Sequence, residues 1–221
     1  MTDEVIVLAG TAAGIGFIHT ILGPDHYVPF IVMSRARGWS GRKTAIVTSL
    51  CGLAHVVSSI LLGMVGLFLG IVVFKLESIE SFRGDLAGWL LMVFGFVYLL
   101  WGIRYAVRAG THERLHHHTH DQSTGNSRNL TPWVLFTIFV LGPCEPLIPL
   151  IMYPAAKQSM VAVAAVAVLF GVTTIATMLA SVMASFYGLS KLSLPKAERF
   201  SHALAGFTIL LCGCAIMFLG L

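Results

Sequence analysis

The segment HTILGPDHYVP, residues 19–29, gathers two histidines, an aspartate and two prolines inside a strongly apolar sequence. Asp25 is the only Lys, Arg, Asp or Glu residue between positions 5 and 34. Proline removes a backbone donor and breaks a helix, and ionisable side chains are costly in lipid. In a membrane protein both features are tolerated where they face protein or water. The segment therefore predicts a functional site in an interrupted transmembrane helix.

The composition supports a location in the lipid bilayer. The 221 residues are 57% hydrophobic and only 11% charged, whereas soluble domains carry about 25% charged residues. Six windows contain no Lys, Arg, Asp or Glu, apart from Asp25 and Glu145, and about 20 apolar residues suffice to cross a bilayer. The sequence thus predicts an all-α membrane protein with six transmembrane helices. The windows are 5–34, 44–74, 86–103, 129–156, 158–190 and 203–221.

The basic residues are distributed unequally between the two predicted sides. Eleven of the 14 lysines and arginines fall in three loops, and Lys75, Arg83 and Lys157 fall on the other side. The positive-inside rule then predicts that both termini face outward. The same rule accounts for the basic loops without nucleic acid, so we expect no nucleic-acid partner. The three basic loops, predicted to be cytoplasmic, are 35–43, 104–128 and 191–199.

The two halves of the chain resemble each other. LAGWLLMVFGFVYLLWGI (86–103) aligns without gaps to LAGFTILLCGCAIMFLGL (204–221), 118 positions later. GLAHVVS (52–58) aligns to GVTTIAT (171–177), and Leu-Gly-Pro occurs at 22–24 and again at 141–143. An odd number of helices per repeat predicts inverted topology. We therefore expect two inverted three-helix repeats, 1–103 and 129–221, joined by a His-rich cytoplasmic linker, 104–128.

Both repeats begin with a helix that carries Leu-Gly-Pro followed by polar residues. Paired interrupted helices at matching positions of two halves indicate a substrate site near the middle of the membrane. We therefore predict that helices 1 and 4 are broken and that the two breaks face each other. The predicted break residues are Gly23, Pro24, Gly142 and Pro143.

The candidate side chains around these breaks are typical metal ligands. Imidazole and carboxylate groups together suit nickel, cobalt, zinc or iron(II). In the second helix, Cys51 and His55 are four positions apart and share one face. The candidate ligands for a substrate metal ion are His19, Asp25, His26, His55, Cys144 and Glu145.

The long loop contains a second histidine cluster, within THERLHHHTHD (111–121). Such tracts bind transition metals, which makes this one a candidate auxiliary metal loop. The sequence contains no phosphate loop, nucleophile elbow or zinc-protease motif, so we expect neither an enzyme nor a prosthetic group. The histidines of the tract are His112, His116, His117, His118 and His120.

The segment GFIHTILGPDH (16–26) resembles the nickel/cobalt transporter (NicO/UreH-like) branch of the LysE-type superfamily. Its members typically carry H-x4-D-H in an early helix, and here the spacing is His19-x5-Asp25-His26. His55 and the His-rich loop resemble the exporter members of that branch. The resemblance implies a secondary transporter of nickel or cobalt in a bacterial or archaeal inner membrane, with transport outward. The sequence leaves open whether the chain forms a homodimer.

The second break favours two alternatives. LGPCEPLIP (141–149) resembles the Pro-Cys segments of the CcdA/DsbD cytochrome c biogenesis proteins and of the TauE/SafE sulfite exporters. A sulfite or organic anion exporter is therefore one alternative. A transmembrane thiol–disulfide conduit is the other, although such chemistry needs a cysteine in each break. Helix 4 offers Cys144, whereas Asp25 and His26 occupy the matching place in helix 1.

Overall fold

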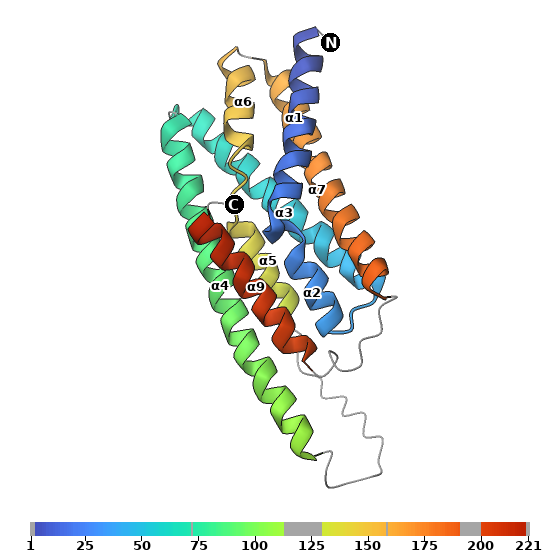
Figure 1. Ribbon diagram of the computed structural model, residues 1–221. Coiled ribbons are helices and arrows are strands. Elements are labelled where there is room, and N and C mark those ends of the chain that lie inside the picture. Colours follow the sequence, from blue (N-terminus) through green and yellow to red (C-terminus); the bar gives the residue numbers. More distant parts are fainter. Residues whose placement is uncertain (1–2, 72, 113–129, 158, 191–199, 220–221) are drawn as a thin grey trace.

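The structure is a computed structural model that describes residues 3–71, 73–112, 130–157, 159–190 and 200–219. The secondary structure of these ranges is helical, and Figure 1 shows the helices packed as one elongated bundle. The elements are α1 (Asp3–Leu22), the short 3-10 helix η1 (Pro24–His26), α2 (Val28–Ala36), α3 (Gly41–Phe68), α4 (Val73–His112), α5 (Thr131–Leu141), α6 (Leu147–Ala156), α7 (Met160–Ser190) and α9 (Ser201–Leu219).

Five helices of the described chain are long and apolar enough to cross a membrane: α1, α3, α4, α7 and α9. The fourth predicted span, 129–156, is instead two short helices, α5 and α6. The chain leaves helical geometry between them because Pro143 has no N–H group and cannot continue the ladder of hydrogen bonds. The chain is therefore an all-helical, multi-pass membrane protein.

The third span differs from its prediction at both ends. The charged segment 75–85, expected as an outer loop, forms the beginning of α4, and α4 continues past residue 103 to His112. The connection from α3 is only a short turn, in which Gly70 adopts a φ of 63°, a conformation that favours glycine. This turn places the charged segment beside α3. Two of its side chains, those of Leu76 and Glu80, are buried in the helical bundle.

Helices α4 and α9 run antiparallel along each other (Figure 1). A methyl group added to Gly95 would come within 2.4 Å of the Leu210 backbone nitrogen, and one added to Gly213 within 2.7 Å of the Met92 nitrogen. Glycine is needed here because the two backbones touch. Gly102 and Gly206 make equally close approaches to the opposite backbone.

Helix α7 packs against both α1 and α3. The contact with α3 is made by glycines on both helices: Gly52 faces Ile175, and Gly171 faces Val56. The seams α1–α7, α3–α7 and α4–α9 thus join helices of the first half of the chain to helices of the second half. The breaks of the two interrupted segments, α1–η1–α2 and α5–α6, border one cavity, as described below.

Candidate functional site

The first break begins where α1 ends at Leu22, at the predicted Gly23-Pro24 position. The Gly23 N–H donates to the His19 carbonyl (3.0 Å), and the His26 N–H donates to the Gly23 carbonyl (3.1 Å), which forms the single turn η1. A methyl group on Gly23 would lie 2.5 Å from His26 Nδ1 and 2.9 Å from Asp25 Oδ1. The absence of a side chain at Gly23 therefore lets the turn fold its own Asp25 and His26 back toward α1.

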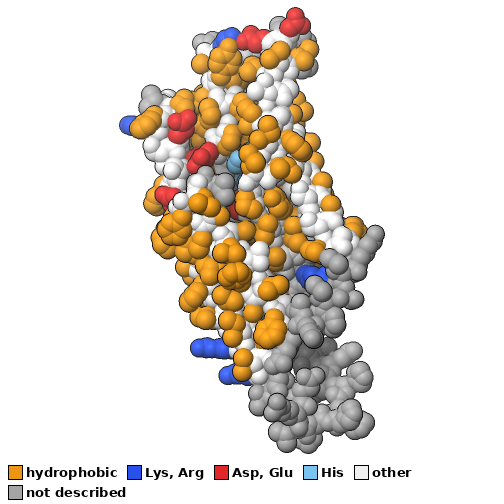
Figure 2. Space-filling view, in the orientation of Figure 1, with side chains coloured by type: hydrophobic (Ala, Val, Ile, Leu, Met, Phe, Trp, Pro, Cys, Tyr) orange, Lys and Arg blue, Asp and Glu red, His pale blue; other side chains and the backbone are white. Residues whose placement is uncertain are grey.

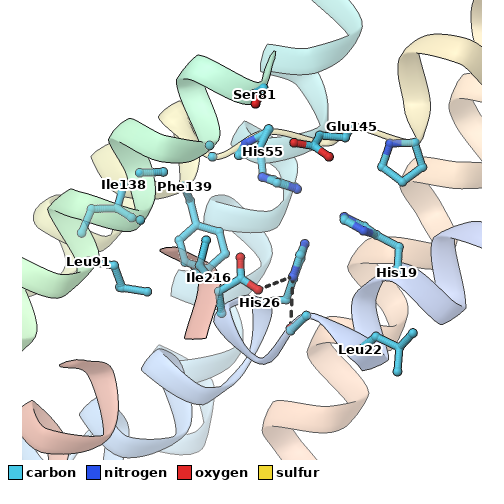
Figure 3. A pocket seen from close by; sticks show the side chains of 18 of the residues that line it. His19, Leu22, His26, His55, Ser81, Leu91, Ile138, Phe139, Glu145 and Ile216 are labelled. Carbon is cyan, nitrogen blue, oxygen red and sulfur yellow. Dashed lines mark hydrogen bonds and ion pairs between the residues drawn. The ribbon is translucent and has the colours of Figure 1, made fainter. Parts of the chain in front are cut away.

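The break brings three imidazoles together. The rings of His19 and His26 have centroids 4.8 Å apart, and those of His26 and His55 are 5.1 Å apart, each pair close to perpendicular (Figure 3). One nitrogen from each ring lies within 4.8 Å of those of the other two. His19 lies on α1, His26 on η1 and His55 on α3, so the cluster joins three elements. Sequence analysis placed these three residues in one site, and the structure brings them together.

The hydrogen-bond partners of His26 indicate which tautomer it adopts. Its Nδ1 lies 3.1 Å from the Gly23 carbonyl and 3.1 Å from Asp25 Oδ1 (Figure 3). Both partners are acceptors, so Nδ1 carries the hydrogen and Nε2 of the neutral ring keeps a free lone pair. A carboxylate bonded to the far nitrogen of a histidine is the usual support of a metal ligand. Asp25 thus supports His26 and is not a fourth member of the cluster.

Four further ring nitrogens of the cluster are buried and make no hydrogen bond of normal geometry among the described residues. They are His19 Nε2, His26 Nε2 and both nitrogens of His55, whose ring faces the Phe139 backbone without a well-aligned bond. His26 is 2% exposed and His55 is 3% exposed. Buried polar atoms without hydrogen bonds cost free energy, and in a native protein they call for a ligand, an ion or a water. The cluster therefore has the donor atoms to hold a cation.

The three histidines line a cavity of about 710 Å³. Gly23 contributes to it from the first break, and Gly142 and Pro143 contribute from the second, so both breaks border one space. Figure 2 shows a histidine within a hollow of the surface, with acidic side chains beside it. The carboxylate-bearing residues that line the cavity are Asp25, Asp85 and Glu145.

A buried ion pair holds the second break. Arg83 Nη1 pairs with Glu80 Oε1, and Glu80 is fully buried. Arg83 Nη2 donates to the carbonyl of Val140 (2.8 Å) and, more weakly, to that of Gly142 (3.4 Å). Glu80 Oε2 accepts from the Cys144 N–H (3.1 Å). Arg83 thus supplies hydrogen bonds to carbonyls at the end of α5, and Glu80 accepts one from an N–H just before α6. The helix dipoles favour this arrangement, because they stabilise positive charge at a helix C-terminus and negative charge at an N-terminus.

Two serines of α3 complete this arrangement, which we name the Glu80–Arg83 clamp. Ser58 Oγ accepts from Arg83 Nη2 (2.8 Å), and Ser59 Oγ donates to Glu80 Oε2 (3.3 Å). The clamp was not predicted, because Arg83 was expected to lie in an outer loop. A signal was present in the sequence: Glu80 and Arg83 are three positions apart, a spacing that pairs side chains on one face of a helix.

The other predicted residues lie outside the histidine cluster. Cys144 has a fully buried side chain packed among apolar residues of α6 and α7, and it does not line the cavity. Cys51 is buried in a separate apolar cluster. Glu145 lines the cavity but is not part of the three-histidine group. His112 is the last residue of α4. The remaining loop histidines, His116, His117, His118 and His120, lie outside the described residues.

One protein family matches most of the chain. The family of the cytochrome c biogenesis protein transmembrane region matches residues 29–219, a range that includes His55 and Cys144 but begins after His26. No curated protein and no solved structure matches the chain. The family is a helical membrane family, in agreement with the apolar helices of the structure. The chain therefore belongs to the cytochrome c biogenesis protein transmembrane region family.

Proposed function

We propose that the protein is a membrane carrier for a divalent transition-metal ion, with His19, His26 and His55 as the ligands. The observation that supports this most is the set of buried imidazole nitrogens without partners, which converge on one cavity. Neutral imidazole is a ligand for nickel, cobalt and zinc. Nitrogens within 4.8 Å of one another are close enough for small side-chain movements to bring them onto one ion.

Each ligand has a distinct role in this proposal. The Asp25 carboxylate and the Gly23 carbonyl fix the His26 ring and leave its Nε2 lone pair free for the metal. His19, on α1, and His55, on α3, approach from two other sides. Cation binding would then tie α1, the break and α3 together, and release would require only that these elements separate.

We further propose that the two halves are inverted repeats, which supports a transport function. Gly95 lies against Leu210, and the counterparts of these residues 118 positions away, Gly213 and Met92, also lie against each other. In each case a residue of one half touches the other half, and its repeat counterpart makes the same contact in the opposite direction. Such reciprocal contacts are expected when a two-fold axis in the membrane plane relates the two halves. The same exchange, 119 positions apart, relates the contacts Gly52–Ile175 and Gly171–Val56.

The orientation proposed from the basic loops can be tested by labelling single cysteines. With both termini outside, a membrane-impermeant thiol reagent should label Thr2→Cys but not Thr119→Cys in intact cells. The background should carry serine at the native cysteines. Labelling of Thr119→Cys from outside would reverse the proposed orientation.

Transport itself is tested in proteoliposomes loaded with a fluorescent metal chelator. We expect Co²⁺ or Ni²⁺ to enter vesicles that contain the wild-type protein, and His19→Ala, His26→Ala and His55→Ala to abolish that flux. The matched control is His202→Asn, because His202 lies in α9 and interacts with the Tyr98 hydroxyl outside the cavity. Absence of flux with wild type, or equal flux in all variants, would contradict the proposal.

The family match favours a second candidate, a transmembrane thiol–disulfide conduit. Cys144 lies in the second break, as this function would require. Position 25, the counterpart of Cys144 in the first break, is an aspartate, and Cys51 is buried in a different apolar cluster from Cys144. The described breaks thus offer one thiol, whereas exchange through a mixed disulfide needs a second one to resolve it.

Substitution of Cys144 separates the two candidates. Cys144→Ser should leave Co²⁺ flux in proteoliposomes largely intact, because its thiol does not line the cavity. A thiol–disulfide conduit would lose all electron transfer in the same variant. An anion exporter of the sulfite type would show neither Co²⁺ flux nor electron transfer that depends on Cys144. The cavity argues against it, because the described residues that line the space include three carboxylates and no lysine or arginine.

A further inference from the structure

We infer that the cavity holds a second, outer cation-binding position, formed by Asp85 and Glu145, which takes a hydrated divalent cation before the ion reaches the histidines. This inference rests on the proposed transport function, because it describes how the same cavity is filled. The outer position binds through carboxylate oxygens, whereas the inner position binds through the nitrogens of the histidine cluster.

Close packing of α4 against the second break brings the two carboxylates into one space. A methyl group on Gly84 would lie 2.9 Å from the Pro143 ring, so α4 touches the break directly at this glycine. Asp85 follows Gly84 on α4, and Glu145 follows Cys144 in the break, so the contact carries both acidic side chains with it. Both line the cavity, together with Ser81, which lies four positions before Asp85 on the same helix face.

The neighbouring basic residue does not neutralise these carboxylates. Arg83 is engaged by Glu80, Ser58 and the carbonyl of Val140, and it does not line the cavity. No Lys or Arg side chain is among the described residues that line the cavity, so its charge is negative. A cleft with one sign of charge and low-dielectric walls concentrates counter-ions. The cavity therefore selects cations before any ligand exchange.

An independent observation indicates that this cavity receives a ligand. His26 lines the same space, is at least nine-tenths buried, and has a ring nitrogen, Nε2, without a partner among the described residues. Asp85 and Glu145 are exposed side chains, which suits contact with an ion that still holds its waters. A cation that enters the cavity would thus first meet oxygen donors while it still holds water, and would then meet nitrogen donors after it has lost water.

The donor types separate the positions chemically. Carboxylate and water oxygens suit Mn²⁺, whereas imidazole suits Co²⁺ and Ni²⁺. Mn²⁺ is therefore a probe for the outer position, read by electron paramagnetic resonance of the free ion. Co²⁺ is a probe for the inner position, read by the visible absorption that imidazole coordination produces. The detergent-solubilised full-length protein serves for both titrations.

The test compares three variants with wild type. In the double variant Asp85→Asn/Glu145→Gln we expect Mn²⁺ affinity to fall by about tenfold or more, with the Co²⁺ spectrum retained. In His19→Ala/His26→Ala/His55→Ala we expect the Co²⁺ spectrum to be lost and Mn²⁺ binding to remain. Glu77→Gln is the matched control, because Glu77 is exposed on α4 and does not line the cavity.

The outcomes distinguish the two proposals. If Mn²⁺ fails to bind wild type, or binds the double variant equally well, the outer position is wrong whatever Co²⁺ does. If Mn²⁺ binding depends on Asp85 and Glu145 while wild type gives no Co²⁺ spectrum, the outer position stands and the histidine carrier fails. Loss of Mn²⁺ binding in Glu77→Gln would show general surface attraction and would also overturn the inference.

Discussion

The two helix breaks start from the same tripeptide, Leu-Gly-Pro, but their polar groups are treated in opposite ways. At the second break the Glu80–Arg83 clamp supplies a partner for the Val140 carbonyl and the Cys144 N–H. At the first break the turn satisfies its own backbone, and the imidazole nitrogens of His19 and His26 are left without partners.

This difference separates the structural role of a break from its functional role. A broken helix in lipid must satisfy the freed backbone groups, and the clamp does this for α5–α6 with a buried ion pair. The first break retains unsatisfied side chains at the wall of a cavity, which is costly unless a ligand binds there. We therefore expect the second break to govern stability and the first to govern ligand binding.

The largest effect on stability should come from breaking the clamp on one side. Arg83→Met leaves Glu80 as a buried carboxylate without its cation, and loss of one partner of a buried pair costs about 3–5 kcal/mol. Thermal unfolding in detergent, followed by circular dichroism, should show a much lower midpoint than wild type. The control is Lys157→Met, which removes the exposed pair with Glu4 and should change the midpoint little. Equal midpoints for the two variants would show that the clamp does not hold the second break.

Equivalent glycines offer a matched comparison of the two breaks. Gly23→Ala places a methyl group 2.5 Å from His26 Nδ1, whereas in Gly142→Ala the nearest atom, His55 Nδ1, is 3.3 Å away. Gly23→Ala should therefore displace His26 from Asp25 and weaken Co²⁺ affinity by about 10- to 100-fold, as loss of a supporting partner does. Gly142→Ala should have a smaller effect. Calorimetric titration of both variants measures this, and the reverse order would refute the division of roles.

A graded effect is expected from pH. A metal ion binds neutral imidazole, so affinity should be full above the ordinary imidazole value of about 6.5 and should fall as pH drops below it. Co²⁺ titrations between pH 5 and 8 should show this decline together with proton release on binding. An affinity that stays constant across this range would argue against imidazole ligands.

The sequence predicted the first break well because its signals are local. Leu-Gly-Pro marked both interruptions, and the spacing of His19, Asp25 and His26 placed them around a single turn. His55 was named as a candidate because it shares a helix face with Cys51 and resembles a histidine of the nickel/cobalt exporters. The helical membrane class followed from composition, and the structure supports it with five helices long enough to span.

The rest depended on contacts that are distant in sequence. The clamp joins α3, α4 and the second break, and nothing in the local pattern around Arg83 indicated that its partners are backbone carbonyls near position 140. Cys144 was named as a candidate ligand from its position in the break. Its side chain packs among apolar residues instead, and packing direction cannot be read from a sequence without regular periodicity.

The most direct test of the account is the number of metal ions that the purified protein binds. Wild type, equilibrated with Co²⁺ and passed through a desalting column, should retain one ion per chain, with an absorption spectrum typical of imidazole coordination. His26→Ala should retain none while keeping the unfolding midpoint of wild type, because His26 belongs to the break that binds the ligand. Retention of the ion by His26→Ala, or its absence from wild type, would contradict the central claim that the first break is a metal site.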